Sequence, residues 1–249
     1  MSDRTDEAPE DPLAFRVGGS TVGENLRRSL NSGYLTGQGD GTLRIAGSPL
    51  PDRHWVVVDY GPPLGCDFLM DFLFYGAYAQ SAVPHGCRNC YKVKVVPRSL
   101  RELIAALDVA KGLPCRSKWG VDLDNRFSQN VYAGYFYTNG LDAARATYRA
   151  VRQIIDARPF LGPDIVMTIK RGCSEYEAVL GPSDRYQFAP EMAALEDHLR
   201  TLYRSRSARR DVSIPLADWI DVAFRIGDDT YLDYTGGERL RPRQVTYDP

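Results

Sequence analysis

The pattern that most constrains this chain is a succession of strand and helix signals between residues 91 and 170. Apolar and polar residues alternate over 91–96, which predicts a strand with one buried face. Ser99 and Glu102 then have capping-box spacing ahead of an apolar helical stripe that ends at Gly112. Further strands are predicted over 118–123, 131–137 and 165–169, and a second helix, capped by Asn139, over 141–155.

This β-α-β-β-α-β order is the split unit of ferredoxin-like folds. The sequence therefore predicts an α+β protein with a ferredoxin-like core, an N-terminal extension and C-terminal helices. The extension contains strand signals over 43–45 and 54–60 and an apolar helical segment over 67–80. We expect a disordered tail over 1–13, one domain over 14–235 with its core at 91–170 and a helical part at 173–228, and an irregular tail over 236–249.

Two of the five cysteines, Cys87 and Cys90, lie immediately before the first strand of this unit. Cys115 precedes the second strand, and Cys173 follows the fourth. Right-handed crossovers make strands one and two parallel and run strand four in the opposite direction, so these positions share one edge of the sheet. The predicted topology therefore brings four cysteines together.

Composition limits the compartment and the partners. The 249-residue chain is 43% hydrophobic and has a formal net charge of −1, which gives no whole-chain electrostatic footprint for nucleic acid or a membrane. The first dozen residues are polar and lack the apolar region of a secretory signal. We expect a cytoplasmic protein with no membrane association and with reduced thiols, where a Cys-x-x-Cys pair favours metal binding or catalysis over a disulfide.

Four cysteines gathered by the fold suit a [4Fe–4S] cluster somewhat better than zinc, because zinc ribbons typically use two Cys-x-x-Cys knuckles. The expected ligands are Cys87, Cys90, Cys115 and Cys173. His85 and Cys66 compete for the fourth position. The alternative to a metal site is that these cysteines are simply small buried hydrophobes.

Several residues near the same edge or on the sheet are candidates to face a substrate. Cys173 lies beside Lys170 and Arg171 at a strand-to-helix turn, where Ser174 and Glu177 have capping-box spacing, so it is either a ligand or a nucleophile. The predicted catalytic residues are Cys173, Lys118, Tyr135 and Glu175, and Arg126 and Tyr137 are further substrate-facing candidates. The leading hypothesis is a cytoplasmic metalloenzyme, with an iron–sulfur or zinc centre, that acts on a small molecule.

The alternative is a metal-stabilised module that binds RNA or DNA. The strand sequence YAGYFY at 132–137 has the alternating aromatic residues of base-stacking sheets. An arginine cluster could contact phosphates, and its members are Arg200, Arg204, Arg206, Arg209 and Arg210. A metal-free structural protein is the third interpretation.

Overall fold

A computed structural model describes residues 11–46, 54–58, 65–122, 130–205, 214–240 and 246–247. The described chain is a mixture of helices and antiparallel strands, which confirms the α+β class. Its strands are β1 (Arg16–Val17), β2 (Ser20–Thr21), β3 (Leu35–Gly37), β4 (Leu43–Ile45), β5 (Trp55–Val58), β6 (Cys90–Val96), β7 (Ser117–Val121), β8 (Tyr132–Asn139) and β9 (Val166–Arg171). Its α-helices are α1 (Val22–Asn31), α2 (Leu100–Lys111), α3 (Leu141–Asp156), α4 (Ser174–Leu180), α5 (Glu191–Leu202) and α6 (Leu216–Ile226).

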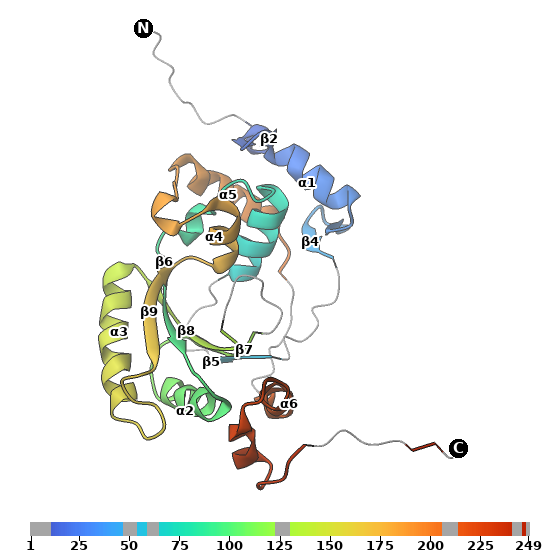
Figure 1. Cartoon of the computed structure of the whole chain (residues 1–249). Coiled ribbons are helices and arrows are strands. Elements are labelled where there is room, and N and C mark those ends of the chain that lie inside the picture. Colours follow the sequence, from blue (N-terminus) through green and yellow to red (C-terminus); the bar gives the residue numbers. More distant parts are fainter. Residues whose placement is uncertain are drawn as a thin grey trace.

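The main sheet has five strands in the order β5-β7-β8-β6-β9, and every neighbouring pair is antiparallel (Figure 1). Strands β6, β7, β8 and β9 lie where the sequence predicts strands, and α2 and α3 fill the two crossovers. The predicted strand over 54–60 is present as β5, which adds an edge strand beside β7. Strand β6 is thus flanked on both sides, by β8 and by β9.

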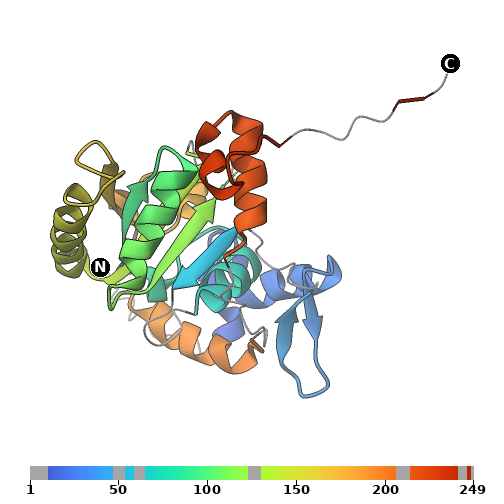
Figure 2. The same cartoon turned by 90° about the horizontal axis from the view of Figure 1, so that it is seen from below.

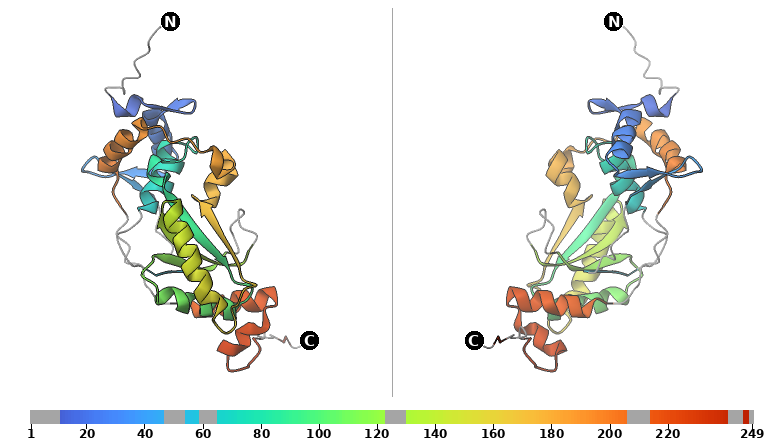
Figure 3. Two further views of the ribbon diagram at one scale, coloured as in Figure 1. Left: turned by 90° about the vertical axis from the view of Figure 1, so that its left-hand side faces the viewer. Right: turned by 90° about the vertical axis from the view of Figure 1, so that its right-hand side faces the viewer.

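One face of this sheet carries the larger apolar core. Val93 and Val95 of β6, Trp119 of β7 and Phe136 of β8 are fully buried there with the inner sides of α2, α3 and α6. Figures 2 and 3 show α2 and α3 lying along this face, with α6 beside α2. Side chains alternate between the two faces of a strand, so Lys92, Lys94, Tyr135 and their neighbours lie on the opposite face.

A second apolar core forms where β6 begins and β9 ends, beneath α1, α4 and α5 (Figure 1). Its centre is the apolar segment predicted to be a helix, which is a π-helix over Asp67–Ala77. Phe72, Leu73 and Phe74 are completely buried within it. Segments of π-helix are rare and occur frequently at functional sites.

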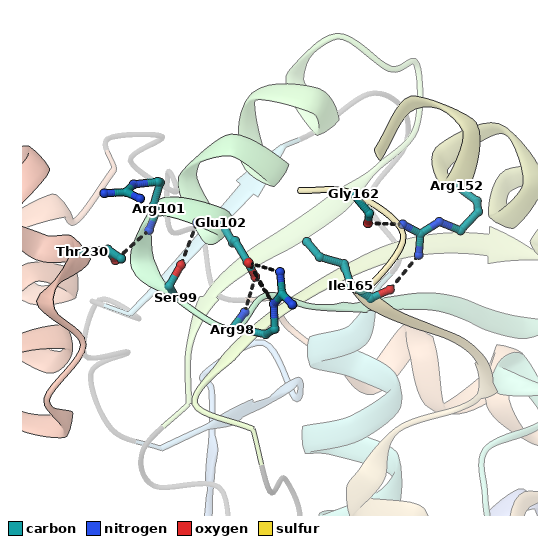
Figure 4. A network of polar contacts seen from close by, with 8 residues as sticks. All are labelled: Arg98, Ser99, Arg101, Glu102, Arg152, Gly162, Ile165 and Thr230. Carbon is teal, nitrogen blue, oxygen red and sulfur yellow. Dashed lines mark hydrogen bonds and ion pairs between the residues drawn. The ribbon is translucent and has the colours of Figure 1, made fainter. Parts of the chain in front are cut away.

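Polar contacts fix the connections of the sheet (Figure 4). Ser99 accepts a hydrogen bond from the Glu102 N–H at 3.3 Å and caps α2 as predicted. The Glu102 carboxylate does not complete a capping box, because it accepts from the Arg98 N–H at 2.7 Å and from the Arg98 guanidinium. Arg152 of α3 donates to the carbonyls of Gly162 and Ile165, both at 2.7 Å, and so holds the turn before β9.

Two predicted caps are wrong, and one helix was missed. Gly140, with φ 92°, precedes α3 in place of Asn139, and no side chain caps this helix. Cys173 is the N-cap residue of α4, while Ser174 and Glu177 both bind Lys170 instead of forming a capping box. The sequence analysis missed α1, although Thr21 and Glu24 form its capping box.

No helix in the described part of the chain has both the length and the apolar character that a membrane crossing requires.

Candidate functional site

All five cysteines line one pocket of about 460 Å³. They come from four separate stretches of the chain, one of which carries both Cys87 and Cys90. Cys66 is the N-cap residue of the π-helix, Cys87 ends the short 3₁₀ turn His85–Cys87, and Cys90 begins β6. Cys115 lies in the connection from α2 to β7, and Cys173 lies between β9 and α4.

The sheet register explains this convergence. Gly172 N–H donates to the Cys90 carbonyl at 2.9 Å, which places Cys173 directly beside the start of β6. The Gly140 N–H donates to the Asn89 carbonyl at 2.8 Å, and Cys90 lies opposite Asn139, so the end of β8 joins the same edge. The structure therefore brings together the four cysteines predicted from the topology, and it adds Cys66.

The five thiols differ in exposure. Of the five, Cys87 is buried, Cys66 is exposed, and the other three are half-buried on the pocket wall. Although the Cys66 residue as a whole is exposed, partial desolvation of its thiol against the pocket wall, together with the neighbouring thiols of Cys173 and Cys90, raises its pKa to about 11. Burial also raises the pKa of Cys87 and Cys90, and nearby thiols raise both further.

Cys115 stands apart from the other four. Burial raises the pKa of its thiol, without a contribution from another cysteine. Its Sγ lies 3.6 Å from the Tyr137 carbonyl oxygen and 3.7 Å from the Arg116 carbonyl oxygen. By contrast, at least one other cysteine raises the pKa of Cys66, of Cys87 and of Cys90. Cys66, which the sequence offered only as a competitor for the fourth position, is thus electrostatically linked to the Cys87 and Cys90 end of the pocket.

A buried cation lies at the base of this group. Lys92 is 7% exposed, and its Nζ donates to Cys173 Sγ at 3.0 Å. The ammonium also lies over the Tyr137 ring, 5.2 Å from its centre. The sequence analysis missed Lys92, although it follows Cys90 by two residues and therefore shares its face of β6.

A second buried charge holds the loop that carries Cys87. The Glu196 carboxylate of α5 is 5% exposed and accepts from the His85 N–H at 2.5 Å and the Gly86 N–H at 2.9 Å. Tyr78 OH donates to the same carboxylate at 3.0 Å. Cys87 itself contacts Tyr176 OH at 3.4 Å. These contacts position the turn between the π-helix and β6.

The predicted substrate-facing residues fall into two groups. Tyr137 lines the cysteine pocket. Lys118 and Tyr135 lie opposite each other on β7 and β8, and neither they nor Glu175 of α4 line it. Arg126 lies outside the described residues.

The features proposed for nucleic-acid contact are dispersed. Tyr132 and Phe136 of YAGYFY belong to the apolar core, whereas Tyr135 and Tyr137 lie on the opposite face. Arg200 packs over the Phe68 ring at 4.1 Å, and Arg204 forms an ion pair with Asp40 at 3.0 Å. Arg206, Arg209 and Arg210 lie outside the described residues.

The thiols are the type of ligand that a soft metal centre uses, but their arrangement does not match the requirements of a single metal ion. Thiolates select zinc and iron–sulfur clusters. Within the described ranges, no three His, Cys, Asp or Glu side chains converge on one point as a single metal ion requires. The cysteines instead surround a cavity.

Comparison with known proteins returned no match for this chain among protein-family models, curated proteins or solved structures.

Proposed function

We propose that the cysteine pocket binds an iron–sulfur cluster and that the protein is an enzyme acting on a small molecule. The observation that carries this proposal is the convergence of five cysteines, from four stretches of the chain, on one pocket of about 460 Å³. The fold beneath it supports the arrangement. We infer a ferredoxin-like split unit over residues 90–171, because the strand order β7-β8-β6-β9 and the two helical crossovers match that topology.

A cluster is favoured over a single zinc ion by the spread of the thiols. Each cysteine of a [4Fe–4S] centre binds a different iron, so its ligands surround a volume. Zinc requires four ligands about 2.3 Å from one point. The described thiols line a wall and do not converge on such a point.

The proposed ligands are Cys87, Cys90, Cys173 and one of two further cysteines. Cys66 is electrostatically linked to the other three, which favours it over Cys115 as the fourth ligand. A four-cysteine cluster is anionic, and the buried Lys92 supplies a compensating positive charge and a hydrogen bond to Cys173.

An enzyme is favoured over a purely structural centre because the pocket, of which a cluster would fill only a part, has the size of a small-molecule site. Its volume of about 460 Å³ lies within the range of roughly 300–1,000 Å³ that is typical of small-molecule sites. Asn89, Asn139 and Thr138 bring polar groups to its wall. Cys115, if it is not a ligand, faces this same space as a thiol near the substrate.

Anaerobic reconstitution with ferrous iron and sulfide tests the proposal and assigns the fourth ligand. We expect broad visible absorbance with about four irons per chain, lost in Cys87→Ser. Cys66→Ser should impair assembly strongly, and Cys115→Ser should leave it nearly unchanged. Equal assembly in Cys87→Ser and in the original protein would show that the pocket does not hold the cluster.

A further inference from the structure

The face of the main sheet opposite α2 and α3 carries a row of polar side chains in register. Lys118 of β7 lies opposite Tyr135 of β8, Tyr135 lies opposite Lys94 of β6, and Lys94 lies opposite Thr168 of β9. We call these four residues the lysine face. Val57 of β5 lies opposite Lys118, and Trp55 borders the row, with its ring 6.0 Å from that of Tyr135.

The lysines near this row differ in the contacts that their ammonium groups make. Lys170 binds Ser174 Oγ at 2.8 Å and Glu177 at 3.3 Å, and Lys92 is bound to Cys173. Lys118 lies over the Trp55 ring at 4.3 Å. Lys94 has neither a hydrogen-bond nor an ion-pair partner in the described part of the chain.

Lys94 is half-buried between neighbouring strands. Burial and the like charge of Lys170 lower its pKa, although Asp122 and Glu177 act in the opposite direction at longer range. A half-buried ammonium without a partner is costly, and an anion placed beside it would remove that cost.

We propose that the lysine face binds the phosphate group of a small phosphorylated molecule, with Lys94 as its principal contact. Lysines bind phosphate as point charges, and Tyr135 and Thr168 add hydroxyl groups on either side of Lys94. Adjacent strands are about 4.8 Å apart, so Lys118 and Lys94, two strands apart, span a distance suited to a ligand of nucleotide size.

The aromatic side chains argue for a small ligand over a single-stranded nucleic acid. Stacking of successive bases needs free ring faces. The Trp55 ring already lies against Tyr135 and Lys118, and burial of Tyr135 raises its pKa to about 12. These rings form a side wall for the lysine face more readily than a platform for bases.

The lysine face lies on the same side of β6 as the cysteine pocket, with the buried Lys92 between them. Cys90, Lys92 and Lys94 alternate along the same face of β6. At about 3.3 Å per residue, the backbone positions of Cys90 and Lys94 are roughly 13 Å apart. The inference thus names a substrate class for the proposed enzyme, but phosphate binding at Lys94 does not require the metal centre and can be tested without it.

Calorimetric titration of the full-length protein with pyrophosphate tests this inference, with metal content recorded for every sample. We expect binding in the original protein and a Kd raised about tenfold or more in Lys94→Gln, the loss typical of one hydrogen bond to a charged group. Lys94→Arg, which keeps the charge, should retain most of the affinity. Lys111→Gln, an exposed lysine of α2 in the opposite layer, is the matched control and should bind normally.

Three outcomes would show that Lys94 is not a phosphate-binding residue. These are undetectable pyrophosphate binding by the original protein, equal losses in Lys94→Gln and Lys111→Gln, or malonate binding as tightly as pyrophosphate. A single-stranded oligonucleotide that binds far more tightly than pyrophosphate through Lys94 would replace the small ligand with a nucleic acid. If the protein has a normal iron content but does not bind pyrophosphate, only the phosphate site is contradicted. If it binds pyrophosphate through Lys94 but contains no iron, only the proposed cluster is contradicted.

Discussion

Lys92 and Cys173 form the closest polar contact inside the cysteine group, with the Lys92 Nζ donating to Cys173 Sγ at 3.0 Å. Burial alone would lower the pKa of Lys92, but the nearby Cys173, Tyr137 and Cys90 outweigh it, so this pKa lies well above its ordinary value. A buried ammonium is stable when an anionic or strongly accepting group faces it. The contact therefore supplies the buried Lys92 ammonium with a sulfur acceptor inside the cysteine group.

Removal of the Cys173 sulfur should destabilise the protein, because the buried Lys92 ammonium then lacks a partner. In Cys173→Ala, measured by urea unfolding in the presence of a chelator, we expect the free energy of unfolding to fall by about 1.5–3 kcal/mol. The double variant Lys92→Met/Cys173→Ala should recover part of this loss, because the unpaired charge is gone. Cys115→Ala, whose thiol makes only long contacts with two carbonyls, should cost less. Strictly additive effects of the Lys92 and Cys173 changes would contradict the coupling.

Glu196 should make stability depend on pH. Burial raises the pKa of its carboxyl group above 4.5, although the hydrogen bonds from Gly86, His85 and Tyr78 oppose this. The folded state therefore binds a proton more tightly than the unfolded state does. This contribution to stability is complete below pH 4.5 and is lost as the pH rises through the folded pKa.

The difference in the free energy of unfolding between the original protein and Glu196→Gln isolates this contribution, because the effects of the other titrating groups are the same in both proteins and cancel. We expect the stability of the original protein, relative to the variant, to decline as the pH rises above 4.5 and then to level off. Urea unfolding at a series of pH values measures it. A difference that grows with pH would mean that the carboxylate is stabilised in its ionised form.

Cys66 should react slowly for an exposed thiol. Because its pKa is raised to about 11, little thiolate is present at neutral pH in the metal-free protein. The rate of alkylation by iodoacetamide, followed at Cys66 by mass spectrometry, should rise about tenfold per pH unit from pH 7 to beyond pH 9. Free glutathione in the same samples is the control. A plateau of the Cys66 rate near pH 8.5, the ordinary range of a thiol, would disprove the raised pKa.

The sequence predicts the elements of the sheet well because strong alternation marks each of its strands. The segment 91–96 and the leucine stripe after Ser99 locate β6 and α2 with little error. The convergence of Cys90 with Cys173 follows from topology alone, since the end of β9 must lie beside the start of β6.

The remaining features depend on contacts that local sequence does not encode. Cys66 lies more than twenty residues before Cys87 in the sequence. It lines the same pocket because the π-helix packs against the end of the sheet. The sequence predicts that Lys92 is a solvent-facing residue of a strand, yet it is buried against Cys173 and the Tyr137 ring. The cap of α3 is a glycine with positive φ, and Asn139 instead ends β8 opposite Cys90.

The most direct test of the account is the iron, sulfide and zinc content of the full-length protein purified without air. The account predicts a brown protein with about four irons and four sulfides per chain, and a Cys173→Ser variant that loses both the colour and the iron. A colourless protein with stoichiometric zinc would contradict the cluster and favour a zinc site. A colourless protein with neither metal, which also fails to take up iron and sulfide on reconstitution, would contradict the metal centre itself.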